Sequence, residues 1–228
     1  MELYHVLNRG VDKRTIFLDN TDRARFVHNL YEFNDVEAAG NSYRHFNKAT
    51  QMMDLRGPSF GWLQTRSRKR IVDIHGWCIM GNHYHLLLSE RVPSGISRFL
   101  MKLNVGYAKY FNERYERSGT LFQGRTKKVH ITSDPHFLYI LHYIHLNPLD
   151  FSDTTRDWRV QKITSTKKAL AHLDEYRWSS YQDYCGTKNF PSLLSTSLFM
   201  DVFGNYREAL STYLHDMELE EIKTLTLE

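Results

Sequence analysis

Two apolar segments joined by only two residues constrain the fold more than any other feature of the sequence. The segments 71–80 and 83–90 are rich in aliphatic residues, and the Gly-Asn dipeptide between them suits a tight hairpin turn. In a strand alternate side chains share a face, so His83 and His85 point the same way, about 6–7 Å apart. Leu87 follows them on that face. The side chains expected on the opposite, buried face are Tyr84, Leu86 and Leu88.

The flanking segments alternate between strand and helix patterns. Residues 2–10 alternate apolar and polar side chains, and 19–34 has helical spacing after a cap-like Asn20 or Thr21. Beyond the hairpin a long amphipathic helix is predicted at 95–117, capped by Ser94, and a short strand at 126–131. The apolar stripe of the long helix is Ile96, Leu100, Leu103, Tyr107, Tyr110 and Phe111. The order β-α-β-β-α-β is that of a ferredoxin-like, split βαβ arrangement with an antiparallel sheet.

Further segments extend this core. A third helix is predicted at 133–148, because Pro135 suits its first turn and an Asn-Pro pair ends it. Between about 35 and 69 the pattern dissolves into polar residues, which indicates an insertion or a loop. We therefore predict an α+β protein with a main domain at 1–149, which carries the 35–69 insertion. A helical C-terminal extension at 150–228 is expected to pack on the same domain.

Composition excludes several classes of protein. A content of 41% hydrophobic and 14% aromatic residues is enough for a packed core. Cys78 and Cys185 are too few for a disulfide framework, which favours a reducing compartment. No apolar run approaches the roughly 20 residues of a membrane span. We expect a cytoplasmic protein without a membrane partner.

Positive charge is concentrated in one part of the chain. Residues 98–128 hold eight Lys or Arg and only two acidic residues, whereas the whole chain has a formal net charge of +4. A local basic segment on an almost balanced chain favours a surface that faces a polyanion such as nucleic acid. A solvated helix face remains the alternative.

The third predicted helix presents polar groups on one stripe. Tyr139, Tyr143 and Asn147 are spaced four residues apart and so lie on the same side of the helix. Beside a strand with two histidines, this stripe could complete a divalent-metal site from imidazoles and an amide oxygen, with a tyrosine close by. His142 and His145 lie off the stripe, and a zinc site built from them with the histidine pair is an alternative.

Several segments together resemble a known family. MGNHYHLLL resembles the histidine-hydrophobic-histidine motif of the HUH nucleases. Other segments resemble the single-tyrosine transposases, specifically the REP-associated tyrosine transposases related to IS200-type elements. These segments are YHVLNRG, GYAKYFNERYERSGTLFQGR, YIHLNP and WSSY, in chain order. The resemblance runs from about residue 3 to 186.

The resemblance implies a metal-dependent endonuclease and strand transferase that cleaves hairpin-flanked single-stranded DNA and takes part in DNA transposition. The nucleophile implied is Tyr143, which would form a covalent 5′-phosphotyrosine and leave a 3′ hydroxyl; Tyr139 is the second candidate. The implied ligands of a Mg²⁺ or Mn²⁺ ion are His83, His85 and Asn147. In the IS200-type relatives the helix-borne ligand is Gln, and here it is the shorter Asn.

The resemblance also implies partners. We expect single-stranded DNA with a REP-like hairpin as substrate and either a monomer or a homodimer as the active form. The residues expected to bind DNA are Arg9, Arg114, Arg117, Arg125, Lys127 and Lys128. Two other functions fit the same residues: a catalytically inactive nucleic-acid-binding protein of this fold, and a metal-dependent phosphodiesterase that uses water in place of the tyrosine.

Overall fold

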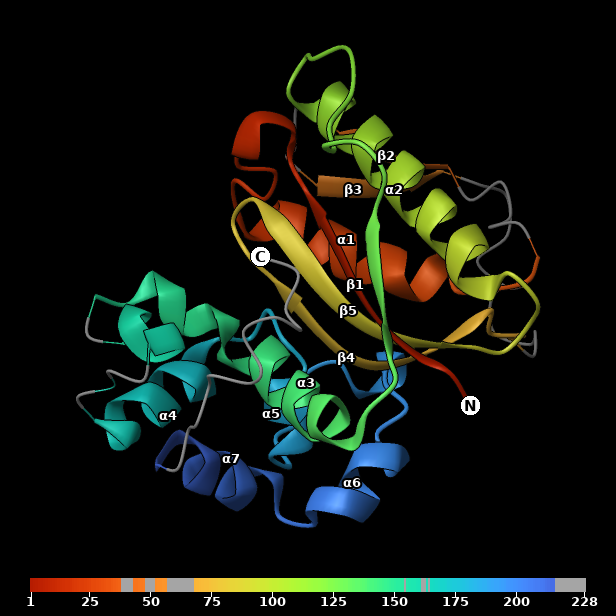
Figure 1. Ribbon diagram of the computed structural model, residues 1–228. Helices are drawn as coiled ribbons and strands as arrows, with labels where there is room; N and C mark the ends of the chain where they lie inside the picture. The colour runs from red at the N-terminus through yellow and green to blue at the C-terminus, as the bar shows by residue number, and fades with distance from the viewer. Residues whose placement is uncertain are drawn as a thin grey trace.

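A four-stranded antiparallel sheet forms the centre of the protein (Figure 1). The computed structural model describes residues 1–37, 68–153, 155–160, 163 and 165–215, with only the backbone at 157, and the backbone of two strands at 43–47 and 52–56. The strands of the main sheet are β1 (Leu3–Arg9), β4 (Val72–Ile79), β5 (His83–Glu90) and β6 (Lys127–Ile131). Their spatial order is β4-β5-β1-β6, with every neighbouring pair antiparallel.

Helices cover both faces of this sheet. On one face lie α1 (Asn20–Glu32) and α2 (Gly95–Arg114), and on the other lies α3 (Asp134–Leu146) with the helices that follow it (Figure 1). The following helices are α4 (Thr166–Glu175), α5 (Tyr181–Tyr184), α6 (Ser197–Phe203) and α7 (Tyr206–His215). The short 3₁₀ helices are η1 (Val11–Lys13), η2 (Asn147–Phe151), η3 (Arg156–Val160) and η4 (Pro191–Leu193). The β1-α1-β4-β5-α2-β6 order confirms the predicted α+β, ferredoxin-like core.

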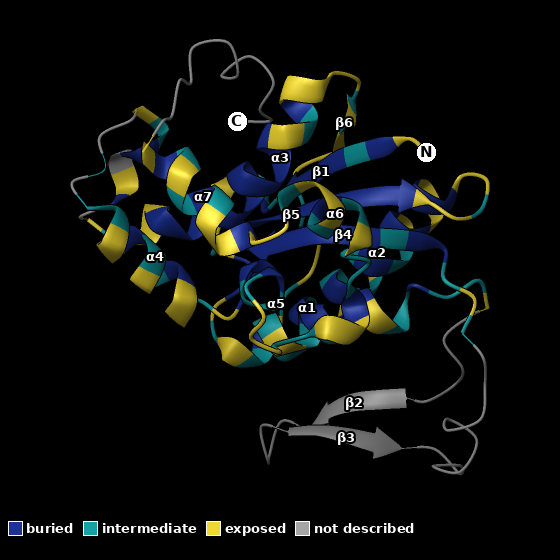
Figure 2. Cartoon of the chain, turned by 90° about the horizontal axis from the view of Figure 1, so that it is seen from below, coloured by how far each residue is buried: buried dark blue, intermediate teal, exposed yellow. Residues whose placement is uncertain are grey.

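The register of β5 gives the sheet two different faces. Leu7 of β1 and Cys78 of β4 both lie opposite His85, so these three residues share a face. Leu87 lies on the same face and packs in the core with α3. The residues of β5 that pack instead in the core with α1 and α2 are Tyr84, Leu86 and Leu88. The predicted division of the hairpin into two faces is confirmed, and Figure 2 shows β4 and β5 buried between the layers.

The ends of α1 and α2 differ from the prediction. Asp19 is the residue that caps α1, because its side chain accepts a hydrogen bond from the backbone N–H of Asp22. Ser94 makes no capping bond. The helix α2 ends at Arg114, because Glu116 adopts a left-handed backbone conformation that a helix cannot continue. The predicted apolar stripe of α2 is confirmed, since all six of its residues are buried.

A buried carboxylate ties α1 to α2. Asp22 is fully buried, and its oxygens accept hydrogen bonds from Arg114 at 2.6 Å, from the phenols of Tyr110 at 2.9 Å and Tyr115 at 2.8 Å, and from the backbone N–H of Leu18 at 2.8 Å. Four donors at one carboxylate leave few of its lone pairs unused. Removal of the carboxylate would take away the acceptor that these four donors share.

Asp22→Ala is therefore expected to destabilise the protein by about 3–5 kcal/mol, because it removes one of the two carboxylates that pair with Arg114 and the carboxylate to which two phenols donate. Urea unfolding followed by circular dichroism measures this change in the free energy of unfolding. Asp201→Ala, at an exposed position on α6, is the matched control and should change stability by less than about 0.5 kcal/mol. A loss of under about 1 kcal/mol at Asp22 would contradict the proposed role of the carboxylate.

The second face of the sheet shares one hydrophobic core with α3 and the helices after residue 150. Tyr206 of α7 lies at its centre, and its hydroxyl is 2.7 Å from Nδ1 of His145. Nε2 of the same histidine is 2.7 Å from the hydroxyl of Ser180, which also accepts the backbone N–H of Trp77 on β4. This chain of hydrogen bonds fixes α7 and α3 to the sheet. No helix in the described ranges is long and apolar enough to cross a membrane.

Part of the segment expected to be an insertion or a loop forms strands. A separate two-stranded antiparallel sheet consists of β2 (Tyr43–Asn47) and β3 (Met52–Arg56). Their mixed polar composition gives no alternating pattern from which strands could be predicted. The rest of that prediction, from 38 to 67 outside these strands, lies outside the described residues.

Candidate active site

The two histidines of β5 converge on the face of the sheet that α3 covers. The ring centroids of His83 and His85 are 4.9 Å apart, with the rings nearly perpendicular. Nδ1 of His83 lies 2.6 Å from Oδ1 of Asn82, whose amide nitrogen donates to the carbonyl of Lys13. That second bond fixes the orientation of the amide, so the carboxamide oxygen faces the imidazole. His83 must therefore carry its proton on Nδ1 and its lone pair on Nε2.

A third histidine orients the second ring. Nε2 of His5, on β1, lies 2.9 Å from Nδ1 of His85, and the two rings are stacked with centroids 5.2 Å apart. Within the described residues, Nε2 of His83 and Nε2 of His85 are buried and make no hydrogen bond. Two such nitrogen atoms on neighbouring rings can coordinate one metal ion through their lone pairs. The hydrogen bond from His85 to His5 is of the kind that holds a metal-binding histidine in orientation.

Burial keeps these imidazoles neutral. Loss of hydration, together with the nearby charges of Arg9 and Arg159, lowers the pKa of His83 to about 3. Burial also lowers the pKa of His85 well below its usual value. Since metal ions bind the neutral imidazole, both rings are in the form that coordinates a divalent cation at neutral pH. The residues present therefore fit a divalent metal ion.

The predicted nucleophile lies against the histidines. Tyr143, on α3, is only 1% exposed, and its ring centroid is 5.6 Å from that of His85 and 5.7 Å from that of His5. Its ring also packs 6.0 Å from the ring of Trp158. Tyr139 packs on Tyr143 with a centroid distance of 5.6 Å. The structure thus brings the sequence-predicted tyrosine and histidine pair together from different elements.

Asn147 lies one helical turn from Tyr143, and both ends of its amide group already make hydrogen bonds. It is fully buried at the junction of α3 and η2, and its amide nitrogen donates to the carbonyl of Tyr143 at 2.8 Å. Its oxygen, the atom expected to bind metal, accepts a hydrogen bond from Nη2 of Arg159 at 2.8 Å. Arg159 also donates to Asp150 at 2.9 Å and lies over the rings of Trp158 and Tyr143. We call η2 and η3, which carry these groups, the strap.

The alternative zinc ligands have other partners. His142 and His145 both lie within hydrogen-bond distance of the hydroxyl of Tyr206, and His145 also bonds to Ser180. No group of three or more His, Cys, Asp or Glu side chains suited to a metal ion occurs in the part of the chain that the structure describes. The structure thus gives these two histidines a packing role and does not support the zinc alternative.

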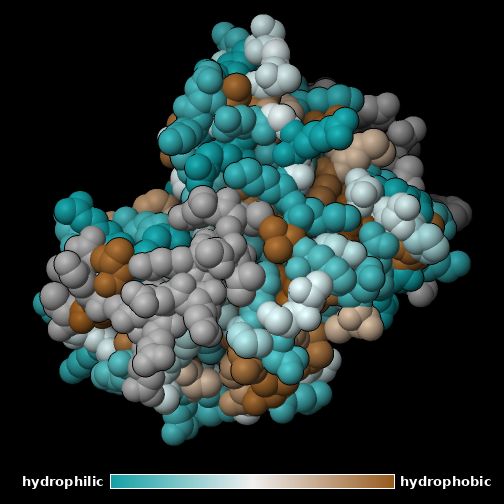
Figure 3. Space-filling view, viewed as in Figure 1, coloured by the Kyte–Doolittle hydropathy of each residue, from teal (hydrophilic) through white to brown (hydrophobic). Residues whose placement is uncertain are grey.

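Three of the expected DNA-binding residues line one hollow. It has a volume of about 170 Å³, and its lining residues are Leu7, Asn8, Arg9, Gln123, Arg125 and Lys127. Arg9 is the cross-strand neighbour of His83, so the hollow adjoins the histidine pair. Figure 3 shows hydrophilic side chains over the loop between α2 and β6, which leads to this hollow.

The other three cations lie apart from the hollow. Lys128 points to the opposite face of the sheet, where its ammonium group lies 4.6 Å from the ring centroid of Tyr4. The side chain of Arg114 is 7% exposed and is bound to Asp19 and Asp22, which leaves it a structural role between helices. Arg117 donates to the side chain of Asn112 at 2.7 Å, at the end of α2.

Sequence reasoning missed three residues that shape the site. His5 sits in an alternating strand pattern that gives its face but not its partner strand. Asn82 was assigned only to the hairpin turn, although it orients His83. Arg159 lies in a polar segment without periodicity, and no sequence signal places it beside Tyr143. The contact of His5 depends on the pairing of β1 with β5, and that of Arg159 depends on the path of the strap.

Comparison with known proteins agrees with the motifs. Residues 61–147, which include β4, β5, α2, β6 and α3, match the model of a family described as IS200-like transposases. This segment is therefore similar to the IS200-like transposases, in agreement with the motifs, and the match supports a DNA-processing role of the transposase type. A solved structure of a REP-associated tyrosine transposase bound to a REP hairpin is similar, with a TM-score of 0.48 and 12% identity over 86% of this chain and 87% of that one. No curated protein matches the sequence.

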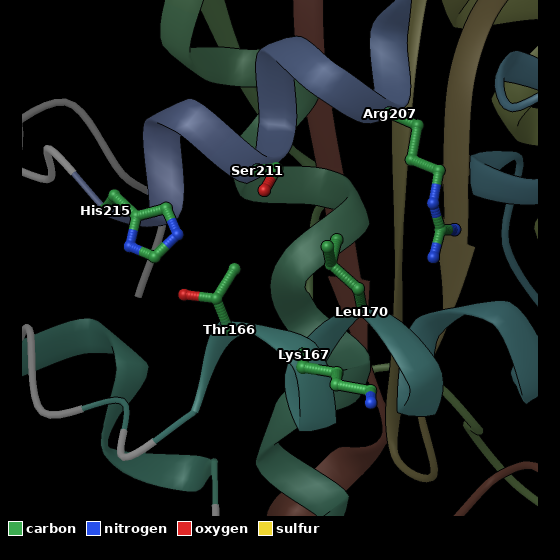
Figure 4. Close-up of a pocket in the computed structure, with 6 residues that line it drawn as sticks. All are labelled: Thr166, Lys167, Leu170, Arg207, Ser211 and His215. Atoms are coloured by element: carbon green, nitrogen blue, oxygen red, sulfur yellow. The ribbon is translucent and has the colours of Figure 1, made fainter.

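A larger hollow lies elsewhere, between α4 and α7 (Figure 4). Its volume is about 400 Å³, and it is lined by Thr166, Lys167, Leu170, Arg207, Ser211 and His215. Arg207 at its edge is paired with Asp174. None of the sequence-predicted site residues lines this hollow, so its size alone does not identify it as the active site.

Proposed function

We propose that the protein is an HUH-type endonuclease and strand transferase that cuts single-stranded DNA through a covalent bond to Tyr143. The single observation that carries this proposal is the packing of the Tyr143 ring against His85 of the histidine pair. Within the described residues, the Nε2 atoms of His83 and His85 make no hydrogen bond. A phenol next to two neutral imidazoles combines a nucleophile with a pair of metal ligands. The matched family model supports the same class of reaction.

The reaction that these residues support is a phosphoryl transfer. The hydroxyl of Tyr143 loses its proton as its oxygen attacks phosphorus, the bond from phosphorus to the 3′ oxygen breaks, and that oxygen takes up a proton. The product is a 5′-phosphotyrosine and a free 3′ hydroxyl. Attack by a 3′ hydroxyl on the phosphotyrosine reverses the step, so strands can be joined without ATP.

His83 and His85 are proposed to hold a Mg²⁺ or Mn²⁺ ion through their Nε2 atoms. When bound, such an ion polarises the scissile phosphate and stabilises negative charge in the transition state. Asn82 keeps His83 in the tautomer that presents Nε2, and His5 orients the ring of His85. Asn147 is proposed as the helix-borne ligand, although its oxygen is bound to Arg159 in this conformation.

The proposed substrate is single-stranded DNA with a hairpin of the REP type. The hollow beside His83 offers Arg9, Arg125 and Lys127 to the phosphate backbone. We propose that residues 1–149 carry the catalytic groups and that 150–228 complete the same domain, since the strap packs on Tyr143.

The direct test is a denaturing gel of the full chain with labelled hairpin oligonucleotides taken from DNA that flanks the gene. The expected result is a covalent protein–DNA species that requires Mg²⁺ or Mn²⁺ and disappears with chelator. Binding without any adduct under each metal would favour the inactive DNA-binding alternative. Cleavage without an adduct would favour a water-using phosphodiesterase.

Lys127 and Lys128 provide a matched test of the DNA surface. Lys127→Ala should weaken the binding of single-stranded DNA severalfold, because it removes one phosphate contact. The slope of the logarithm of the association constant against the logarithm of salt concentration should become less steep by about 0.7. Lys128→Ala should have a smaller effect, since this residue lies on the opposite face over Tyr4. Fluorescence anisotropy at several salt concentrations measures both variants. Equal losses in the two variants would contradict the assignment of the hollow as the DNA surface.

A further inference from the structure

The guanidinium of Arg159 connects the strap to the proposed nucleophile and the helix-borne ligand. It donates to Oδ1 of Asn147 at 2.8 Å and to Oδ2 of Asp150 at 2.9 Å. Its central carbon lies 4.4 Å from the ring centroid of Trp158 and 5.3 Å from that of Tyr143. The other oxygen of Asp150 accepts the indole N–H of Trp158 at 2.7 Å. The strap therefore holds this cation in a defined place.

This placement determines what the Asn147 oxygen can do. The amide nitrogen of Asn147 donates to the carbonyl of Tyr143, so the oxygen must face Arg159. A divalent ion at the same oxygen would lie within a few ångströms of a positive charge, and both cations would compete for its lone pairs. The charge of Arg159 also reaches the histidine pair, since it contributes to the lowered pKa of His83.

We propose that Arg159 is a positioning residue that keeps the Asn147 oxygen out of the metal site in the DNA-free protein. A phosphate of bound DNA is the anion that draws it away, because a guanidinium binds phosphate oxygens through paired N–H groups. The side chain of Arg159 is 27% exposed, so an incoming phosphate has access to it. This inference rests on the proposed metal role of the histidine pair.

The first test is a Mn²⁺ titration of the full chain without DNA, with free Mn²⁺ followed by electron paramagnetic resonance. Arg159→Gln is expected to tighten Mn²⁺ binding about tenfold, because the Asn147 oxygen becomes available. Arg159→Met should behave alike, since its stem can still pack on Trp158 and preserve the fold. Arg156→Gln is the matched control, because Arg156 lies on the same 3₁₀ helix, is 62% exposed and is paired with Asp153.

A second substitution separates the proposed contact from a general charge effect. Removing a positive charge near the histidines would tighten Mn²⁺ binding even if Asn147 were not a ligand. Asn147→Ala is therefore combined with Arg159→Gln, and it is expected to cancel the gain, whereas alone it should change affinity less than about twofold. A gain that persists without Asn147, or no gain in either Arg159 variant, overturns the inference.

Addition of DNA completes the test. In a Tyr143→Phe background, which prevents cleavage, the hairpin oligonucleotide should tighten Mn²⁺ binding about tenfold when Arg159 is present and have little effect in Arg159→Gln. An equal response in both overturns the inference but leaves the proposed function intact, provided that the wild type forms the adduct. Absence of Mn²⁺ binding in every variant, with and without DNA, overturns the metal role and this inference together.

Discussion

We expect Tyr143→Phe to abolish the covalent protein–DNA adduct and to lower the rate of strand transfer by about 10³-fold or more. Phenylalanine lacks the oxygen that attacks phosphorus but preserves the ring. The ring contacts with His85, His5 and Trp158 are therefore retained, and the fold should be unchanged. The measurement is adduct yield on a denaturing gel, with DNA binding followed in parallel by anisotropy.

Tyr139→Phe is the matched control for this result. Tyr139 is one helical turn away on the same stripe of α3 and packs directly on the Tyr143 ring. This variant should form the adduct at close to the wild-type rate. Loss of adduct in Tyr139→Phe together with full activity in Tyr143→Phe would reverse the assignment of the nucleophile.

His83→Ala is expected to weaken Mn²⁺ binding at least about 100-fold and to remove metal-dependent cleavage. The reason is that Nε2 of His83 is one of the two imidazole nitrogens that face the site without a hydrogen bond within the described residues. Isothermal titration calorimetry of the full chain with Mn²⁺ measures the affinity directly. A wild-type affinity retained by His83→Ala would refute the metal assignment.

His5 and His130 provide graded comparisons for this result. His5→Ala removes the group that orients His85 and should weaken Mn²⁺ binding about tenfold. His130→Ala should leave metal affinity unchanged, because His130 is exposed and stacks on Tyr4 on the other side of the sheet. A large loss of Mn²⁺ affinity in His83→Ala, a moderate loss in His5→Ala and none in His130→Ala would indicate a metal site centred on His83 and His85.

Periodicity was sufficient to predict the core of this fold. The alternation in β5 predicts which side chains share a face, and helical spacing predicts the buried stripe of α2; the structure confirms both. These predictions succeed because each depends on residues close in sequence and on a regular backbone. The spacing of Tyr139 and Tyr143 likewise predicted that they would lie on one side of α3, where their rings are in contact.

The contacts that define the site's chemistry are not periodic. Arg159 reaches Tyr143 because the strap turns back over the end of α3, and its polar residues carry no pattern that reports this path. Charge alone was also a poor guide, since Arg114 and Lys128 belong to the basic segment but are held by Asp22 and Tyr4. Which cation faces DNA depends on strand register, which flips a side chain to the other face with each residue.

The place of β1 in the sheet also affects how the protein folds. Although β1 is the first strand in the sequence, it lies between β5 and β6, where Leu3 pairs with both Ser89 and Ile131. During synthesis the N-terminal strand therefore remains unpaired until its partners, which lie more than 70 residues further along the chain, have been made. Such long-range pairing slows folding, because loop-closure entropy is lost before the contacts form. Since His5 lies on this strand, its bond to His85 cannot form before β5 has been synthesised.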